Sequence, residues 1–185
     1  MVENRERPLP VTAAEPKPID PFEIYVHARR FMQSAIIVSQ RPNPHLWAPQ
    51  AVLQTFALEL HLKCLHLLEN PAQPLPRSHG LLELFFKLRS FRVLMEFAQE
   101  HIEQSEHVKL FEAKFPDMQH DALSILRRCD NLFERIRYQY ENKPWSTDDE
   151  GMSGTSGIDA MIWAVDKWIL INHPEWKERT DGIVI

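Results

Sequence analysis

The stretch "LWAPQAVLQTFALELHLKCLHLLE", residues 46–69, decides the fold class of this chain. Its apolar residues recur at helical spacing, and further leucines lie on the opposite side of the same predicted helix. The main stripe is Leu53, Phe56, Leu60, Cys64 and Leu67, and the leucines opposite are Leu58, Leu62 and Leu65. A helix that is apolar on two sides is central in a bundle, or it shares one face with another chain.

The preceding segment, residues 21–40, also has a helical pattern. Asp20 has the side chain of an N-cap, and Pro21 suits the first position of a helix. The prolines of "RPNPH", residues 41–45, separate this helix from the next, because proline interrupts the backbone hydrogen bonds of a helix.

Helical periodicity continues beyond the Pro-rich loop at residues 70–78. It predicts helices over 79–89, 90–115, 119–142 and 156–172, the second of them with breaks that the pattern does not place. Ser78 is the expected cap of the first of these helices, and Ser156 with Asp159 has capping-box spacing at the start of the last.

No segment alternates with the period of a strand, so the sequence predicts an all-α, up-and-down bundle of four to five helices. A length of 185 residues favours one domain. We expect a disordered Pro-rich tail over 1–20, the helical domain over 21–175 and a C-terminal tail over 176–185.

Composition indicates an ordinary globular protein, with 44% hydrophobic and 25% charged residues. A net charge of −5 argues against a strongly basic nucleic-acid platform and leaves local basic patches open. The charged N-terminus lacks the apolar region of a secretory signal, and no apolar run looks long enough to span a bilayer. With only Cys64 and Cys129 as cysteines, the chain is expected in a reducing cytoplasm without a membrane partner.

A dense polar cluster closes the predicted helix 119–142, in "FERIRYQYEN" at residues 133–142. On a helical wheel, Ile136 and Tyr140 continue the apolar stripe, whereas Arg137 and Glu141 flank it. Since a guanidinium keeps its charge and carries five donors, Arg137 requires a carboxylate or a phosphate as its neighbour.

Glu59 and Lys63 repeat this pattern on helix 46–69, one turn apart and in the favourable order for an ion pair. If the two helices are neighbours, their polar flanks form one network. The predicted ligand-binding or polar network is Glu59, Lys63, His79, Arg137, Tyr138 and Glu141. It has two interpretations: an ion network that fixes helix register, or a polar groove for a phosphate or a nucleotide.

Three stretches in this order resemble the HEPN superfamily of helical nucleotide-binding domains. They are "LQTFALELHLKCLHLLEN" (53–70), "HGLLELFFKL" (79–88) and "FERIRYQYE" (133–141). The resemblance implies a four- or five-helix bundle that often forms a homodimer. Many relatives are metal-independent endoribonucleases of toxin–antitoxin, phage-defence or CRISPR-linked systems.

The relatives that cleave RNA carry an Arg followed, after four to six residues, by a His. Arg137 stands at the family's Arg place, but no His follows it at this spacing, and Tyr140 and Glu141 are the residues that could substitute for the His. The sequence therefore predicts a non-catalytic module that binds nucleotide, RNA or a partner protein in a bacterial stress, toxin–antitoxin or defence system. The alternatives are a ribonuclease with an altered site made by Arg137, Tyr140 and Glu141, and a purely structural dimeric bundle.

No other motif indicates a metal or cofactor site, and none is expected. His61 and His66 point to different sides of their helix, and both cysteines fall in apolar stripes, where a buried small hydrophobe is the usual role. Trp163 and Leu170 lie opposite the main stripe of the last helix. Together with the second set of leucines on helix 46–69, they are candidates for a dimer surface unless a fifth helix or the 90–115 segment covers them.

Overall fold

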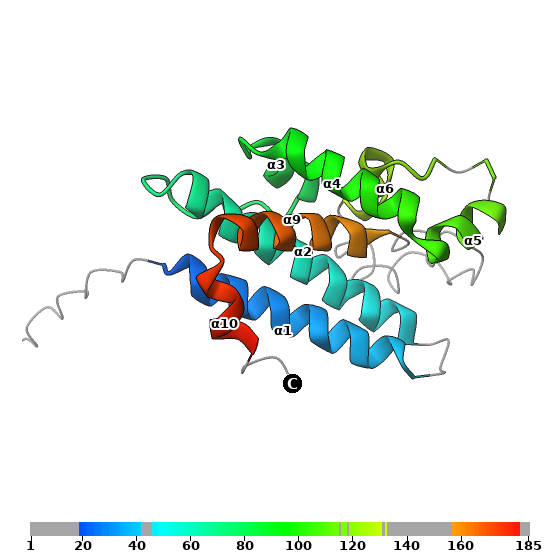
Figure 1. Ribbon diagram of the computed structural model, residues 1–185, viewed down its shortest axis with the longest axis horizontal. Helices are drawn as coiled ribbons and strands as arrows, with labels where there is room; N and C mark the ends of the chain where they lie inside the picture. The colour runs from blue at the N-terminus through cyan, green and yellow to red at the C-terminus, as the bar shows by residue number, and fades with distance from the viewer. Residues whose placement is uncertain are drawn as a thin grey trace, which may run out of the picture.

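The structure is a computed structural model of the chain, and every regular element in its described residues is an α-helix (Figure 1). The described residues are 19–41, 46–114, 116–117, 119–130, 132 and 157–181. The helices are α1 Pro21–Ser39, α2 Trp47–Glu69, α3 Leu81–Phe86, α4 Phe91–Gln104, α5 Glu106–Lys114, α6 Ala122–Cys129, α9 Ile158–Asn172 and α10 Glu175–Asp181. The prediction of an all-α chain is confirmed.

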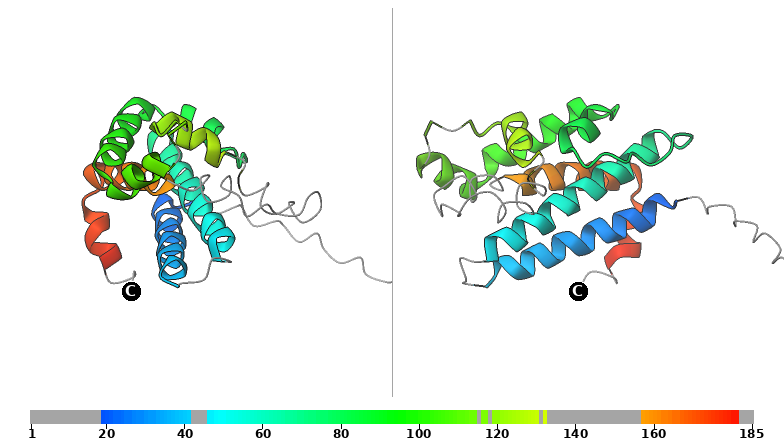
Figure 2. Two further views of the ribbon diagram at one scale, coloured as in Figure 1. Left: turned by 90° about the vertical axis from the view of Figure 1, so that its right-hand side faces the viewer. Right: turned by 180° about the vertical axis from the view of Figure 1, so that it is seen from behind.

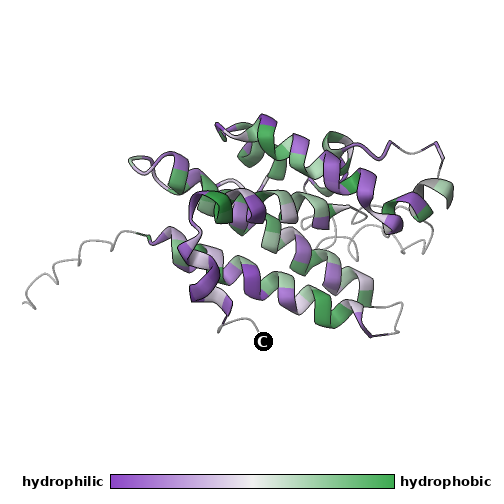
Figure 3. Ribbon diagram, viewed as in Figure 1, coloured by the Kyte–Doolittle hydropathy of each residue, from purple (hydrophilic) through white to green (hydrophobic). Residues whose placement is uncertain are grey.

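Helix α2 occupies the centre of the molecule, as its two apolar sides predict. It lies antiparallel beside α1, and it also packs against α9 and α3, while α4 covers the other side of α9 (Figures 1 and 2). Hydrophobic and hydrophilic residues alternate along α1 and α4 in Figure 3, as expected of helices that bury only one side.

By length and composition, α2 could cross a membrane, so the prediction that no run is long enough was wrong. However, 72% of its most apolar window is buried inside the bundle, which makes α2 a core helix. The leucines Leu58, Leu62 and Leu65 are among the buried residues, so they do not form a free dimer surface. Trp163 is covered from α4, where the His101 ring stacks on it at a centroid distance of 4.6 Å.

The start of α1 follows the sequence prediction, whereas the starts of α3 and α9 do not. Asp20 Oδ1 accepts a hydrogen bond from the backbone N–H of Phe22 at 2.9 Å. The N-cap of α3 is Gly80 rather than Ser78, because Ser78 lies two residues before that N-cap and its hydroxyl donates to Glu83 Oε2.

The N-cap of α9 is Gly157 rather than Ser156. Its φ of 88° lies in the left-handed region that favours glycine. A Cβ atom at Gly157 would also stand 2.5 Å from Ile125 Cδ1. Any other residue at this position would therefore clash with Ile125 of α6.

The 90–115 segment forms two helices, α4 and α5, separated at Ser105. The backbone of Ser105 is extended, and its Oγ accepts from the N–H of Val108 at 3.3 Å, which caps the start of α5.

Residues 176–185 were predicted to be a tail, but Glu175–Asp181 form α10. The Trp176 ring packs 5.1 Å from Phe22 and 5.2 Å from Tyr25, and the Arg179 guanidinium lies 3.5 Å above the Phe22 ring. These contacts with α1 stabilise a helix that is too short to be stable alone.

The predicted helix over 119–142 is described in its first part only, as α6. Asp121 caps it through Ser124 N, and the predicted apolar residues Ala122, Leu126 and Cys129 are buried. The stretch "FERIRYQYEN" lies outside the described residues.

Candidate functional site

The first polar cluster, called here the Glu59 cluster, joins Glu59 and Lys63 of α2 to His79, which precedes α3. Glu59 Oε1 accepts from Lys63 Nζ at 2.7 Å and lies 3.0 Å from His79 Nδ1. Glu59 and Lys63 are buried, at 5% and 7% exposure, whereas 61% of the His79 side chain is exposed. A buried carboxylate therefore orients an imidazole that faces solvent.

The contact with Glu59 determines which nitrogen of His79 is available. Because an ionised carboxylate only accepts hydrogen bonds, Nδ1 carries the proton in this contact. The opposite nitrogen, Nε2, has no partner within the described part of the chain. Lys63 balances the charge of Glu59, so the cluster is neutral with a neutral imidazole and carries one positive charge with a protonated one.

The structure brings together Glu59, Lys63 and His79, as the sequence predicts. The other predicted site residues, Arg137, Tyr138, Tyr140 and Glu141, lie outside the described residues. Their approach to the Glu59 cluster stays a prediction.

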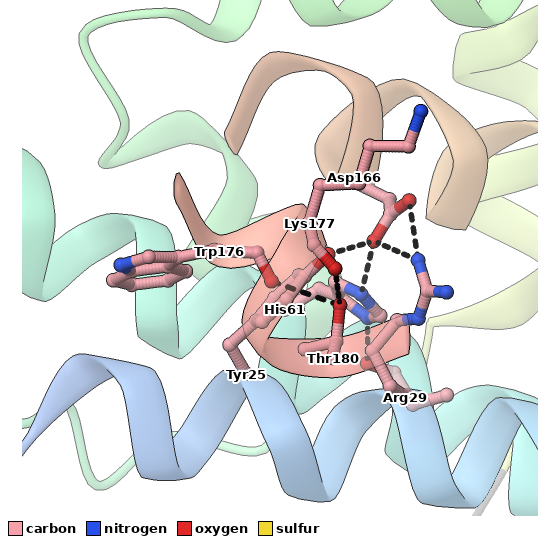
Figure 4. A network of polar contacts seen from close by, with 8 residues as sticks. Tyr25, Arg29, His61, Asp166, Trp176, Lys177 and Thr180 are labelled. Atoms are coloured by element: carbon pink, nitrogen blue, oxygen red, sulfur yellow. Dashed lines mark hydrogen bonds and ion pairs between the residues drawn. The ribbon is translucent and has the colours of Figure 1, made fainter. Parts of the chain in front are cut away.

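A second polar cluster, called here the Asp166 cluster, links α1, α2 and α9 (Figure 4). Asp166 Oδ1 accepts from the Tyr25 hydroxyl at 2.8 Å. Arg29 Nη1 donates to Asp166 Oδ2 at 3.0 Å and to Oδ1 at 3.1 Å. His61 Nε2 lies 3.5 Å from Oδ1, an ion-pair distance that is long for a hydrogen bond.

The surroundings of Asp166 keep its carboxylate ionised. Burial alone would raise the pKa of Asp166, but His61, Arg29 and Tyr25 together lower that pKa to about 2. In turn, burial and the Asp166 charge raise the pKa of the Tyr25 hydroxyl, which stays protonated and donates.

His61 differs from His79 in having no exposed surface. Its Nδ1 lies 2.8 Å from the Ala57 carbonyl oxygen, which can only accept, so Nδ1 donates. With one nitrogen on the backbone and the other facing Asp166, the ring offers nothing to a ligand. The Asp166 cluster is therefore a partly buried polar network that holds three helices together.

Sequence reasoning missed the Asp166 cluster, although one signal was present. Asp166 lies beside the buried positions Ile162, Val165 and Ile169 in a helix that is otherwise largely apolar. A carboxylate at the edge of a buried stripe requires donors nearby, because an unpaired charge is costly to bury. Tyr25 and Arg29, one turn apart on α1, were suitable donors.

Both cysteines are buried, as predicted. Burial raises the pKa of each thiol to about 12. They are therefore protonated at neutral pH and are poor nucleophiles.

A cavity of about 520 Å³ lies between α2, α4 and α9, and its lining contains no residue of either cluster. Its one acidic side chain, Glu69, accepts from the backbone N–H groups of Arg89 and Ser90, immediately before α4 begins. Across the described ranges, no three His, Cys, Asp or Glu side chains gather closely enough to hold a metal ion.

Comparison of the chain with protein-family models, curated proteins and solved structures finds no match.

Proposed function

We propose that this chain is a HEPN-like binding module that recognises the phosphate group of a nucleotide or an RNA at the Glu59 cluster. The observation that carries the proposal is the exposed His79 ring, held through Nδ1 by the buried Glu59 carboxylate. This leaves Nε2 to meet a ligand. A protonated imidazole there gives the cluster a net positive charge, which favours an anion.

The rest of the proposal follows the sequence resemblance. The module acts without cleaving RNA, forms a homodimer in the cytoplasm and belongs to a bacterial stress, toxin–antitoxin or defence system. A partner protein is the other expected ligand, and size-exclusion chromatography with light scattering tests the homodimer directly.

Calorimetric titration with adenosine diphosphate and with a short oligoribonucleotide tests phosphate recognition. His79→Ala should abolish the binding heat, because it removes the only solvent-facing group in the cluster. The matched control is His27→Ala, since His27 is an exposed histidine on α1. Equal binding by the wild type and His79→Ala would reject the Glu59 cluster as the site.

A metal-independent ribonuclease is the second candidate function, and one observation favours it. The Glu59–His79 pair holds an exposed imidazole through Nδ1, and histidine commonly acts as a general acid or base. His79 therefore supplies the proton-transfer group that is absent near Arg137 in the sequence.

Incubation of purified protein with RNA in a chelating buffer tests this activity. Cleavage that persists with chelator and disappears in His79→Gln would establish it, and Glu59→Gln should slow the reaction by releasing the ring. Intact RNA after incubation with the wild type rejects the ribonuclease and leaves the binding module in place.

A further inference from the structure

Aromatic and basic residues alternate in "FFKLRSFR", residues 85–92, where α3 ends and α4 begins. The Phe86 ring is 54% exposed, although its neighbour Phe85 is fully buried. Its centroid lies 6.1 Å from that of Phe85 and 6.2 Å from that of Phe91. The Arg92 guanidinium lies 5.8 Å from the Phe91 ring centroid, so aromatic rings and a cation form one surface.

Two cations of this surface are available to an anionic ligand. Arg89 and Arg92 are exposed, and neither forms an ion pair with a carboxylate of the described residues. The Arg89 side chain donates to the neutral Asn70 amide oxygen at 3.1 Å. The charge of Lys87, in contrast, is balanced by its ion pair with Glu83.

An exposed phenylalanine followed within six residues by two exposed arginines suits an unstacked base joined to phosphates. Aromatic side chains bind the flat face of any base, while arginines bind the backbone. A duplex hides its base faces in the stack, so the exposed ring favours a single strand. An acidic protein partner would satisfy the arginines but would leave the aromatic surface without a stacking partner.

We propose that Phe86, Arg89 and Arg92 form a binding surface for single-stranded nucleic acid, with one base stacked on Phe86. This inference rests on the proposed function and deepens it, because it specifies a polymer rather than a free nucleotide. Helix α3 separates the two places: His79 stands before the helix, Phe86 is its last residue, and the exposed Glu83 between them is neutralised by Lys87. A six-residue helix spans roughly 9 Å, so neighbouring nucleotides of one strand can reach both.

Fluorescence anisotropy with labelled oligouridylate of about ten nucleotides, a length within known single-strand sites, tests the surface. Phe86→Ala should weaken binding about fivefold or more, as expected for the loss of one stacked base. Phe86→Trp should retain binding, whereas Phe86→Leu, which is apolar without a ring, should behave like Phe86→Ala.

Charge is tested by repeating the titrations at several salt concentrations. Arg92→Ala should weaken binding and reduce the slope of log affinity against log salt by about 0.7, the value for one phosphate contact on a single strand. The controls are Leu110→Ala, which removes another exposed apolar side chain, and Arg30→Ala, which removes a cation on α1. Both should bind like the wild type.

The outcomes separate this inference from the proposed function. If the wild type and Phe86→Ala bind oligouridylate equally well, the proposed base-stacking surface at Phe86 is rejected. Phosphate recognition at the Glu59 cluster is unaffected by this outcome. If the wild type binds adenosine diphosphate but no oligouridylate, the polymer is wrong and the nucleotide site stands. If it binds neither, both proposals are overturned.

Discussion

The Glu59 cluster and the Asp166 cluster each join a carboxylate to a histidine, yet they leave the imidazole in opposite environments. In the Asp166 cluster, His61 has no exposed surface and contacts a backbone carbonyl through Nδ1. In the Glu59 cluster, His79 uses Nδ1 for the carboxylate and keeps most of its side chain in solvent. The same pair of residue types therefore stabilises helix packing in the Asp166 cluster and presents an accessible imidazole in the Glu59 cluster.

The difference teaches that burial of the histidine, rather than its pairing, separates the two roles. Both carboxylates are satisfied by cations and hydrogen-bond donors, so pairing alone would make both clusters structural. Only the Glu59 cluster has an imidazole nitrogen that can contact a ligand without breaking the helix packing.

The largest expected loss of stability is in the Asp166 cluster. Asp166→Asn should lower the free energy of unfolding by about 3 kcal/mol or more, because Arg29 and the buried His61 lose the anion they face. Urea denaturation measures the change. Asp181→Asn, at an exposed aspartate that ends α10, should have little effect. A loss below about 1 kcal/mol for Asp166→Asn would show that the cluster contributes no more than a surface ion pair.

Acid should remove the contribution of Asp166 in a defined window. Its pKa is about 2 in the folded chain and about 3.9 when unfolded, so the stabilisation is present above about pH 4 and is lost as the pH falls toward 2. The expected loss is about 2 kcal/mol. Urea denaturation of the wild type and Asp166→Asn across this range should show their stabilities converging, and a constant difference would contradict the lowered pKa.

A smaller loss of stability is expected at the other cluster. Glu59→Gln should cost about 1–2 kcal/mol, because Lys63 loses its partner but can extend its flexible stem toward water. The same denaturation experiment measures it. A loss of stability equal to that of Asp166→Asn would show that the Glu59 cluster stabilises the fold as strongly as the Asp166 cluster does. The two clusters would then not differ in role.

The smallest effect on stability is expected for His79→Ala, at less than about 0.5 kcal/mol, because the side chain is mostly exposed. His61→Ala is its matched comparison and should cost about 3 kcal/mol, since it leaves a cavity in the core and removes one of the groups that face the Asp166 carboxylate. Thermal melts compare the stabilities of the two variants, and similar melting temperatures would contradict the expected difference.

Local patterns in the sequence predicted the helices and part of the site. The two apolar sides of α2 placed it at the centre, and the one-turn spacing of Glu59 and Lys63 predicted their ion pair. These features depend on residues within a few positions of one another, where helical geometry alone fixes the distances.

Features that depend on packing between distant segments escaped prediction. Tyr25 and Asp166 are 141 positions apart, so their hydrogen bond follows from the way α9 packs and not from any local spacing. The close approach of Ile125 of α6 to Gly157, at the left-handed start of α9, likewise joins separate helices. Helix α10 is too short for a clear periodicity and depends on the contact of Trp176 with α1.

Histidine NMR spectra recorded during a titration with adenosine diphosphate test the central claim most directly. The His79 imidazole signals, assigned by their absence in His79→Gln, should move with added nucleotide while those of His61 stay fixed. Movement of the His61 signals with His79 unchanged would contradict the account, and so would spectra in which neither histidine responds.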